Sequence, residues 1–197
     1  MAEQLAEYLV SADDYLAWES QQPTKYELID NRIYPMTGAS RSHNLISTKL
    51  AVALDSGLAV RGCETYTSDM RVQVDKAGIY TYPDLVVVCG EPRFRQYVTQ
   101  DTLLNPTLIF EILSPSTELI DRSQKREQYL QIPSLLGYFL VAQDKPLIEA
   151  YTRQGDERRY RVASGLDARL VIPAPEYEIP LEFIYSKAQF DPADNIK

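Results

Sequence analysis

Two apolar segments of this chain, "LVVVC" and "TLIFEIL", lack the polar alternation of a half-exposed strand, and each is associated with one carboxylate. Asp84 stands directly before the first segment, and Glu111 lies inside the second. Unbroken apolar runs of this length are typical of strands buried on both faces of a sheet. An unpaired carboxylate is costly in such a place, so both acids need a partner or a function. For Asp84 taken alone, the alternative is a role in the turn after Pro83, where its carboxylate would accept a backbone hydrogen bond.

The segments around these two strands predict an α/β or α+β fold. Apolar residues recur at helical spacing from residue 40 to about residue 60, and residues 118–131 predict a second helix. The segment "KYELIDNRIYPM" predicts a hairpin that turns at Asp30 and Asn31, because these residue types tolerate positive φ angles. Together with the buried strands, these elements indicate a central mixed sheet flanked by helices, with an N-terminal hairpin.

The remaining segments complete one predicted domain, residues 1–197, with its core at about residues 24–142. Residues 90–105 have no clear period and predict a surface loop. The C-terminal part predicts a meander that turns near Gly155, followed by a short helix near Leu181.

Few residues of this chain could bind a soft metal. It has one histidine and two cysteines, too few for a zinc site of the usual nitrogen and sulfur kind. Cys63 and Cys89 lie in predicted strands, where we expect free, buried thiols rather than a disulfide. A bound metal would therefore be held mainly by oxygen, which favours Mg²⁺, with Mn²⁺ as the alternative.

The charge balance and the N-terminal residues limit the expected partners and location. The formal charge is −8, which disfavours non-specific duplex binding but is compatible with a local basic groove. The first ten residues contain two glutamates and no lysine or arginine, so they lack the basic region of a signal peptide. No apolar run approaches the roughly 20 residues that span a bilayer. We therefore expect a cytoplasmic protein without a membrane partner.

The two carboxylates are expected to converge, because consecutive strands are usually neighbours in a sheet. Glu111 lies roughly 10 Å back from the end of its strand. Lys125 lies roughly 10 Å along the helix that begins near Glu118, so the two side chains should be level. Asp121 and Tyr129 share the helix face of Lys125. An ammonium beside a metal-bound carboxylate pair could position a phosphate and its attacking water. The alternative for Asp121 and Lys125 is an ordinary surface ion pair.

The ordered motifs "YELID", "SHNLI", "YPDLVVV", "FEILSPST" and "DRSQKREQYLQIPSLLGYFLV" resemble the Uma-two family of restriction-endonuclease-like proteins, a branch of the PD-(D/E)xK nuclease superfamily. The resemblance covers roughly residues 10 to 185 and implies a restriction-endonuclease-like fold. It also implies that Asp84 and Glu111 bind magnesium for phosphodiester hydrolysis, and that Glu27 completes the metal site, directly or through water. The superfamily usually places a lysine two residues after the second acid, where this chain has Leu113. Some branches place this lysine on the following helix, and Lys125 fits that position.

Further residues are candidates for contact with the substrate. The family pattern also favours His43, which could contact the substrate or transfer a proton, or could instead cap the helix or pack against the hairpin. Arg41, Arg122, Lys125 and Arg126 could form a positive rim for phosphates, with Tyr129 as a further substrate-binding candidate. Scattered surface charge is the alternative for the arginines.

These features predict a magnesium-dependent nuclease that hydrolyses DNA more readily than RNA. The alternative is a non-catalytic binding or assembly module that retains the nuclease fold, which the acidic balance and the missing lysine support. A hydrolase of smaller phosphorylated compounds is a third hypothesis. The resemblance, and the exposed aromatic surface that 14 tyrosines can leave, favour a homodimer.

Overall fold

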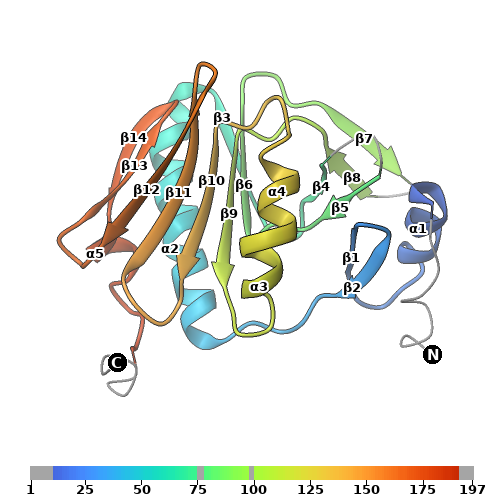
Figure 1. Ribbon diagram of the computed structural model, residues 1–197, viewed down its shortest axis with the longest axis horizontal. Helices are drawn as coiled ribbons and strands as arrows, with labels where there is room; N and C mark the ends of the chain where they lie inside the picture. The colour runs from blue at the N-terminus through green and yellow to red at the C-terminus, as the bar shows by residue number, and fades with distance from the viewer. Residues whose placement is uncertain (1–10, 75–77, 98–99, 191–197) are drawn as a thin grey trace.

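The computed structural model describes residues 11–74, 78–97 and 100–190. Within these ranges the chain forms two six-stranded sheets and one two-stranded sheet, with helices on both sides of the central sheet (Figure 1). None of the helices in these ranges is both long enough and apolar enough to cross a membrane. The first ten residues, from which the lack of a signal peptide was predicted, lie outside the described residues.

The central sheet contains both of the predicted buried strands. Its strands, in spatial order, are β12 (Glu157–Ser164), β11 (Leu147–Gln154), β10 (Gly137–Ala142), β9 (Leu108–Leu113), β6 (Leu85–Cys89) and β3 (Cys63–Thr67). Only β9 and β10 run parallel, and every other neighbouring pair in this sheet is antiparallel. All six residues of β9 are buried, as the unbroken apolar run predicts. The mixed sheet flanked by helices confirms the predicted fold class.

Each face of the central sheet packs against a different layer. One face, with Val87 and Phe110, packs against α2 (Arg41–Leu58) and a C-terminal unit. This unit comprises β13 (Arg169–Pro173), β14 (Glu176–Pro180) and α5 (Leu181–Ile184), the last of which is the helix predicted near Leu181. The other face, with Val86 and Ile109, packs against the second helical segment and the other six-stranded sheet. Adjacent residues alternate between the two cores because side chains in a strand point to opposite faces.

The predicted helix over residues 118–131 is one continuous helical segment with a change of winding. It consists of α3 (Glu118–Ile120), a π-helical turn (Asp121–Lys125) and α4 (Arg126–Tyr129). Asp121, Lys125 and Tyr129 are all buried, whereas Arg122 and Arg126 are partly exposed. A π-helical turn inside an α-helix is frequent at functional sites.

The second six-stranded sheet confirms one prediction and corrects another. Its strands, in spatial order, are β2 (Arg32–Pro35), β1 (Tyr26–Ile29), β5 (Tyr80–Thr81), β4 (Arg71–Gln73), β8 (Gln100–Leu103) and β7 (Phe94–Tyr97), with α1 (Ala12–Glu19) beside it. The β1–β2 hairpin turns at Asp30 and Asn31, whose φ angles are 49° and 61°, as predicted. The prediction of a loop over residues 90–105 is wrong, because β7 and β8 form a hairpin there. Three of the four residues of β7 are exposed, so the strand shows no apolar period, and β8 pairs with β4, which is distant in sequence.

The cysteines also differ from the expectation of free thiols. Cys63 of β3 and Cys89 of β6 are directly opposite each other in an antiparallel pair, with 4.0 Å between their Cα atoms, and they form a disulfide. Residues so placed in neighbouring strands are close enough for this bond. The two cysteines are 26 residues apart in the sequence, so the strand register that brings them together could not be predicted from the sequence.

Candidate active site

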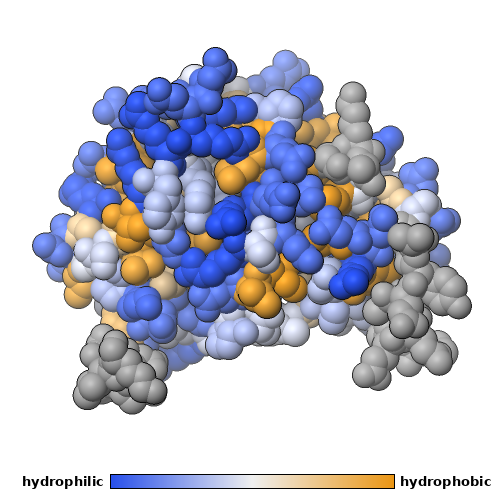
Figure 2. Space-filling model, viewed as in Figure 1, coloured by the Kyte–Doolittle hydropathy of each residue, from blue (hydrophilic) through white to orange (hydrophobic). Residues whose placement is uncertain are grey.

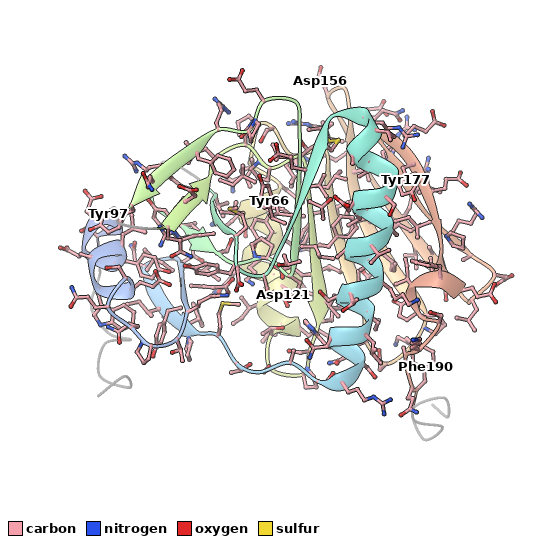
Figure 3. All side chains as sticks on the ribbon, turned by 180° about the vertical axis from the view of Figure 1, so that it is seen from behind. Tyr66, Tyr97, Asp121, Asp156, Tyr177 and Phe190 are labelled. Atoms are coloured by element: carbon pink, nitrogen blue, oxygen red, sulfur yellow. A yellow bond between two sulfur atoms is a disulfide. The ribbon has the colours of Figure 1, made fainter. Side chains whose placement is uncertain are left out.

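A pocket of about 360 Å³ opens beside the C-terminal end of β9, between the start of α2 and the start of the helical segment. Its lining includes Glu27, Asp84, Glu111 and Lys125, together with His43. It also includes Asp121, which Figure 3 shows near the middle of the molecule rather than at its outer edge. Residues from five separate parts of the chain therefore meet in one accessible cavity.

Lys125 lies at the centre of three carboxylates. Its Nζ is 3.0 Å from Glu27 Oε2, 3.2 Å from Glu111 Oε1 and 3.3 Å from Asp121 Oδ1. The Lys125 side chain is 6% exposed and that of Asp121 is 2% exposed, so this is not the solvated surface pair considered from the sequence. The contact with Glu111 agrees with the expectation that the two residues are level, one on the helix and the other on β9.

Asp84 links the two strands at the floor of the pocket. Its Oδ2 accepts a hydrogen bond of 2.7 Å from the backbone N–H of Ile112 and lies 3.1 Å from His43 Nε2. The backbone N–H of Asp84 donates to Glu111 Oε2 at 3.3 Å. The carboxylate thus does bind a backbone amide, as the turn hypothesis expected, but the amide belongs to β9 and not to a local turn. Asp84 and Glu111 are held beside each other by these contacts.

Glu27 reaches the same group of side chains from β1. Its Oε1 accepts a hydrogen bond of 2.9 Å from the backbone N–H of Tyr82, and its Oε2 pairs with Lys125. Both oxygens of Glu27 are therefore engaged with the protein. In this arrangement Glu27 positions the lysine ammonium rather than presenting a free ligand.

Tyr129, a candidate for substrate binding, has a different place. Its side chain is fully buried beneath the pocket, and its hydroxyl lies 2.9 Å from Glu111 Oε1 and 2.9 Å from Thr81 Oγ1. It is not among the lining residues. Tyr129 therefore orients Glu111. Because Tyr129 is buried, it cannot contact the substrate, and the predicted substrate-binding role is wrong.

The structure does not bring the predicted arginine rim to the pocket. Arg41 is exposed at the start of α2, and Arg122 forms ion pairs with Glu118 at 2.7 Å and Glu149 at 2.5 Å. Neither arginine lines the cavity. Within the described ranges, Lys125 and His43 are the basic residues of its lining, against four acids.

Burial and mutual repulsion shift the pKa values of this group. Burial raises the pKa of Glu111 well above its usual range; Asp121 and Asp84 add to the shift, and Lys125 opposes it. Burial also raises the pKa of Asp121. For Lys125, burial disfavours the charged form, but Glu111 and Glu27 outweigh it and raise the lysine pKa well above normal. A further cation in the pocket would favour the fully ionised carboxylates.

The carboxylates of the pocket fit magnesium only as part of a wider set of ligands. Among the residues that the structure describes, no three His, Cys, Asp or Glu side chains are grouped so that they alone could hold a metal. Magnesium, however, is usually bound by one or two carboxylates together with waters and substrate phosphates. Asp84 and Glu111 provide such a pair, and Asp84 Oδ1 accepts no hydrogen bond from the described part of the chain. Asp84 and Glu111 lie beside each other and fit magnesium as a pair. Both oxygens of Glu111, like both oxygens of Glu27, already contact protein groups, so neither glutamate is a free ligand.

Sequence reasoning missed two parts of the pocket. Asp121 received no role in the site, although its spacing from Lys125 is a usable signal. The segment Pro35–Ala39 forms one wall of the cavity, and its residue types contain no signal of this position.

Three comparisons place the chain among known proteins. A family model named Uma2, with the description "Putative restriction endonuclease", matches residues 12–182. An uncharacterized protein of Synechocystis sp. is 37% identical over 150 residues, covering 75% of this chain and 76% of the relative. A second uncharacterized protein of that organism is 36% identical over 150 residues, covering 76% of this chain and 84% of the relative.

The structure is also similar to a crystal structure from Anabaena variabilis whose description is "putative nuclease". The TM-score is 0.74, and the match covers 90% of this chain and 98% of the other. The sequence identity is 17%, so this similarity shows a shared fold and nothing further.

Proposed function

The chain belongs to the Uma2 family, and on this premise we propose that it is a magnesium-dependent nuclease that hydrolyses phosphodiester bonds in DNA more readily than in RNA. One observation supports this proposal above the others: Asp84 and Glu111 converge in an accessible pocket beside the buried ammonium of Lys125. Two adjacent carboxylates with a fixed cation are suited to phosphoryl chemistry, in which charge develops on phosphate oxygens.

In this mechanism Asp84 and Glu111 would hold the metal ion, which would supply Lewis-acid chemistry and activate a water for attack. The hydroxyl of Tyr129 keeps Glu111 oriented, and His43 does the same for Asp84 through Oδ2. Lys125 stabilises negative charge on the substrate phosphate.

The contacts of Lys125 indicate how a phosphate could reach it. Its ammonium donates a hydrogen bond to Glu111 and pairs with Glu27 at 3.0 Å and with Asp121 at 3.3 Å, the longest of the three contacts. Because an ammonium has three protons, a phosphate oxygen could replace Asp121 at the third position more readily than the other partners.

The second candidate function is a non-catalytic binding or assembly module. The acidic lining of the pocket supports it, as do the engaged contacts of Lys125. In such a module the lysine would neutralise the carboxylates and no metal would enter. The two functions therefore differ in whether magnesium binds.

Calorimetric titration with Mg²⁺ and a cleavage assay on single-stranded DNA, duplex DNA and RNA separate the two functions. A nuclease predicts a binding isotherm and cleavage that are lost in Asp84→Ala and Glu111→Ala. Both should persist in the control Glu182→Ala, whose side chain is exposed on α5. A folded wild-type protein that binds no Mg²⁺ or Mn²⁺ and cleaves no substrate would favour the module. Cleavage of nucleotides but not polymers would favour the hydrolase of smaller phosphorylated compounds.

The cytoplasmic location and the homodimer stay predictions from the sequence. Cell fractionation tests the location, and sedimentation of the purified protein tests the oligomeric state. A monomer at all accessible concentrations would contradict the homodimer.

A further inference from the structure

Three tyrosines form a row across the strands at one edge of the central sheet. Tyr151 of β11 is directly opposite Tyr160 of β12, and their ring centroids are 5.0 Å apart. Tyr138 of β10 continues the row inward, 6.3 Å from Tyr151. Tyr138 is fully buried, whereas Tyr160 is 55% exposed. The row therefore leads from the core to an open aromatic surface.

The outer rings of this row are held in fixed positions. The Tyr160 hydroxyl donates a hydrogen bond of 2.9 Å to Glu149 Oε2, and the other oxygen of Glu149 pairs with Arg122. The guanidinium of Arg126 lies over the Tyr151 ring, 5.5 Å from its centroid. A ring that is already ordered loses little conformational entropy when a ligand stacks on it.

Arginines without acidic partners surround these rings. Arg153 and Arg158 are opposite each other, two residues along the strands from the tyrosine pair, so they point to the same side of the sheet. They contact the backbone carbonyls of Pro133 and Leu130. Within the described ranges, Arg126, Arg153 and Arg158 form no ion pair, and their charges remain available to an anion.

This concentration of positive charge is unusual in a chain of net charge −8. Figure 2, in the view of Figure 1, shows strongly hydrophilic residues over the β11–β12 hairpin beside residues of intermediate hydropathy. We name the set Tyr151, Tyr160, Arg126, Arg153 and Arg158 the tyrosine–arginine face.

The tyrosine–arginine face and the pocket share one helical segment. Arg126 follows Lys125 directly in the sequence, and the two side chains point to different sides of the segment. Lys125 lines the pocket, and Arg126 covers Tyr151. The same helical segment therefore contributes one basic residue to the pocket and one to the tyrosine–arginine face.

We propose that the tyrosine–arginine face binds single-stranded nucleic acid, with bases stacked on Tyr160 and phosphates next to the arginines. Exposed aromatic rings in a basic setting are the means by which proteins hold unpaired strands, because every base has a π-face. A duplex hides these faces within its own stack, so the surface selects unpaired segments and has little sequence preference. The inference rests on the proposed function, since it assigns the substrate class of the same protein.

Fluorescence anisotropy tests this proposal with a labelled mixed-sequence DNA strand of about 12 nucleotides, a length within the usual site sizes for such surfaces. EDTA is present throughout, so that binding is measured without cleavage. The substitution Tyr160→Ala should raise the dissociation constant for the single strand about tenfold. Tyr160→Phe keeps the ring, so its dissociation constant should stay within about twofold of the wild-type value. The affinity for a duplex of the same sequence should change little in either variant.

The chain offers a matched control on its other side. Phe183 of α5 is 37% exposed, and Lys49 Nζ lies 4.7 Å from its ring centroid, so it is also an exposed ring with a cation above it. Phe183→Ala should leave the affinity for the strand unchanged. Arg126→Gln gives a second test should Tyr160→Ala fail to fold, and it should also weaken binding of the strand.

The outcomes distinguish this proposal from the nuclease function. If Tyr160→Ala and Arg126→Gln bind the strand as tightly as wild type, or if Phe183→Ala weakens binding equally, the proposal is overturned. The same holds if Tyr160→Ala only converts a dimer to a monomer in sedimentation, because the face would then be a contact between copies of the chain. If strand binding depends on Tyr160 but the protein cleaves no substrate, the result would support the proposed strand-binding role of the tyrosine–arginine face and contradict the proposed nuclease function.

Discussion

Replacing Lys125 with methionine tests whether its ammonium holds the buried carboxylates together. The Lys125 Nζ lies 3.0 Å from Glu27 and 3.2 Å from Glu111, and the residue is 5% exposed. Methionine keeps most of the apolar stem and removes the charge, so the carboxylates lose their cation. Removing one partner of a buried ion pair costs about 3–5 kcal/mol. We expect a loss of this size in the free energy of unfolding of the metal-free protein at mildly alkaline pH.

This loss should become smaller as the pH falls. Burial raises the pKa of Glu111 well above 4.5 in the wild-type protein, and Lys125 opposes that shift. Without the lysine, the folded-state pKa of Glu111 rises further, while in the unfolded chain it stays near its usual value. The folded variant then binds more protons than the unfolded chain between these two pKa values. Its stability therefore increases as the pH decreases through the folded-state value.

Urea denaturation in EDTA, followed by circular dichroism at mildly alkaline and mildly acidic pH, measures both effects. Lys145→Met is the control, because Lys145 is exposed in a turn, and it should change the free energy of unfolding by less than about 0.5 kcal/mol. The reasoning is refuted if Lys125→Met is as stable as wild type, or if it loses the same free energy at both pH values.

Three further predictions concern other contacts. Tyr129→Phe removes a hydrogen bond to Glu111 and should lower the free energy of unfolding by about 1 kcal/mol in urea denaturation; an unchanged value would argue against this contact. His43→Ala removes one of the two contacts of Asp84 Oδ2 and should weaken Mg²⁺ binding about 10- to 100-fold in calorimetry, as the loss of a partner behind a metal ligand usually does; wild-type affinity would contradict a positioning role. Reduction of the Cys63–Cys89 disulfide, which closes a loop of 26 residues, should lower the free energy of unfolding by about 3–4 kcal/mol with dithiothreitol present; equal stability with and without the reductant would contradict this.

Much of the fold could be predicted because its signals are local. The unbroken apolar runs of β6 and β9 identify buried strands, and Asp30 and Asn31 identify the hairpin turn. The same runs single out Asp84 and Glu111, since a carboxylate is conspicuous where every neighbour is apolar. Each of these inferences uses residues only a few positions apart.

The rest depends on contacts between distant segments. The β7–β8 hairpin was missed because exposed strands lack an apolar period and are defined by their partners. Arg122 was predicted to bind the substrate, but it forms an ion pair with Glu149 on β11. No spacing in the sequence indicates this contact, because the two residues lie on separate elements.

The sequence by itself therefore determined the buried strands, the hairpin turn, the main helices and the pair of acidic residues Asp84 and Glu111. Tertiary structure alone decided that Glu27 engages Lys125, that Tyr129 lies beneath Glu111, and that two cysteines meet across β3 and β6. The physical reason is that periodicity and turn chemistry act within a segment. Strand register and the rotation of a helix, in contrast, are set only when separate segments pack together and bury their apolar faces.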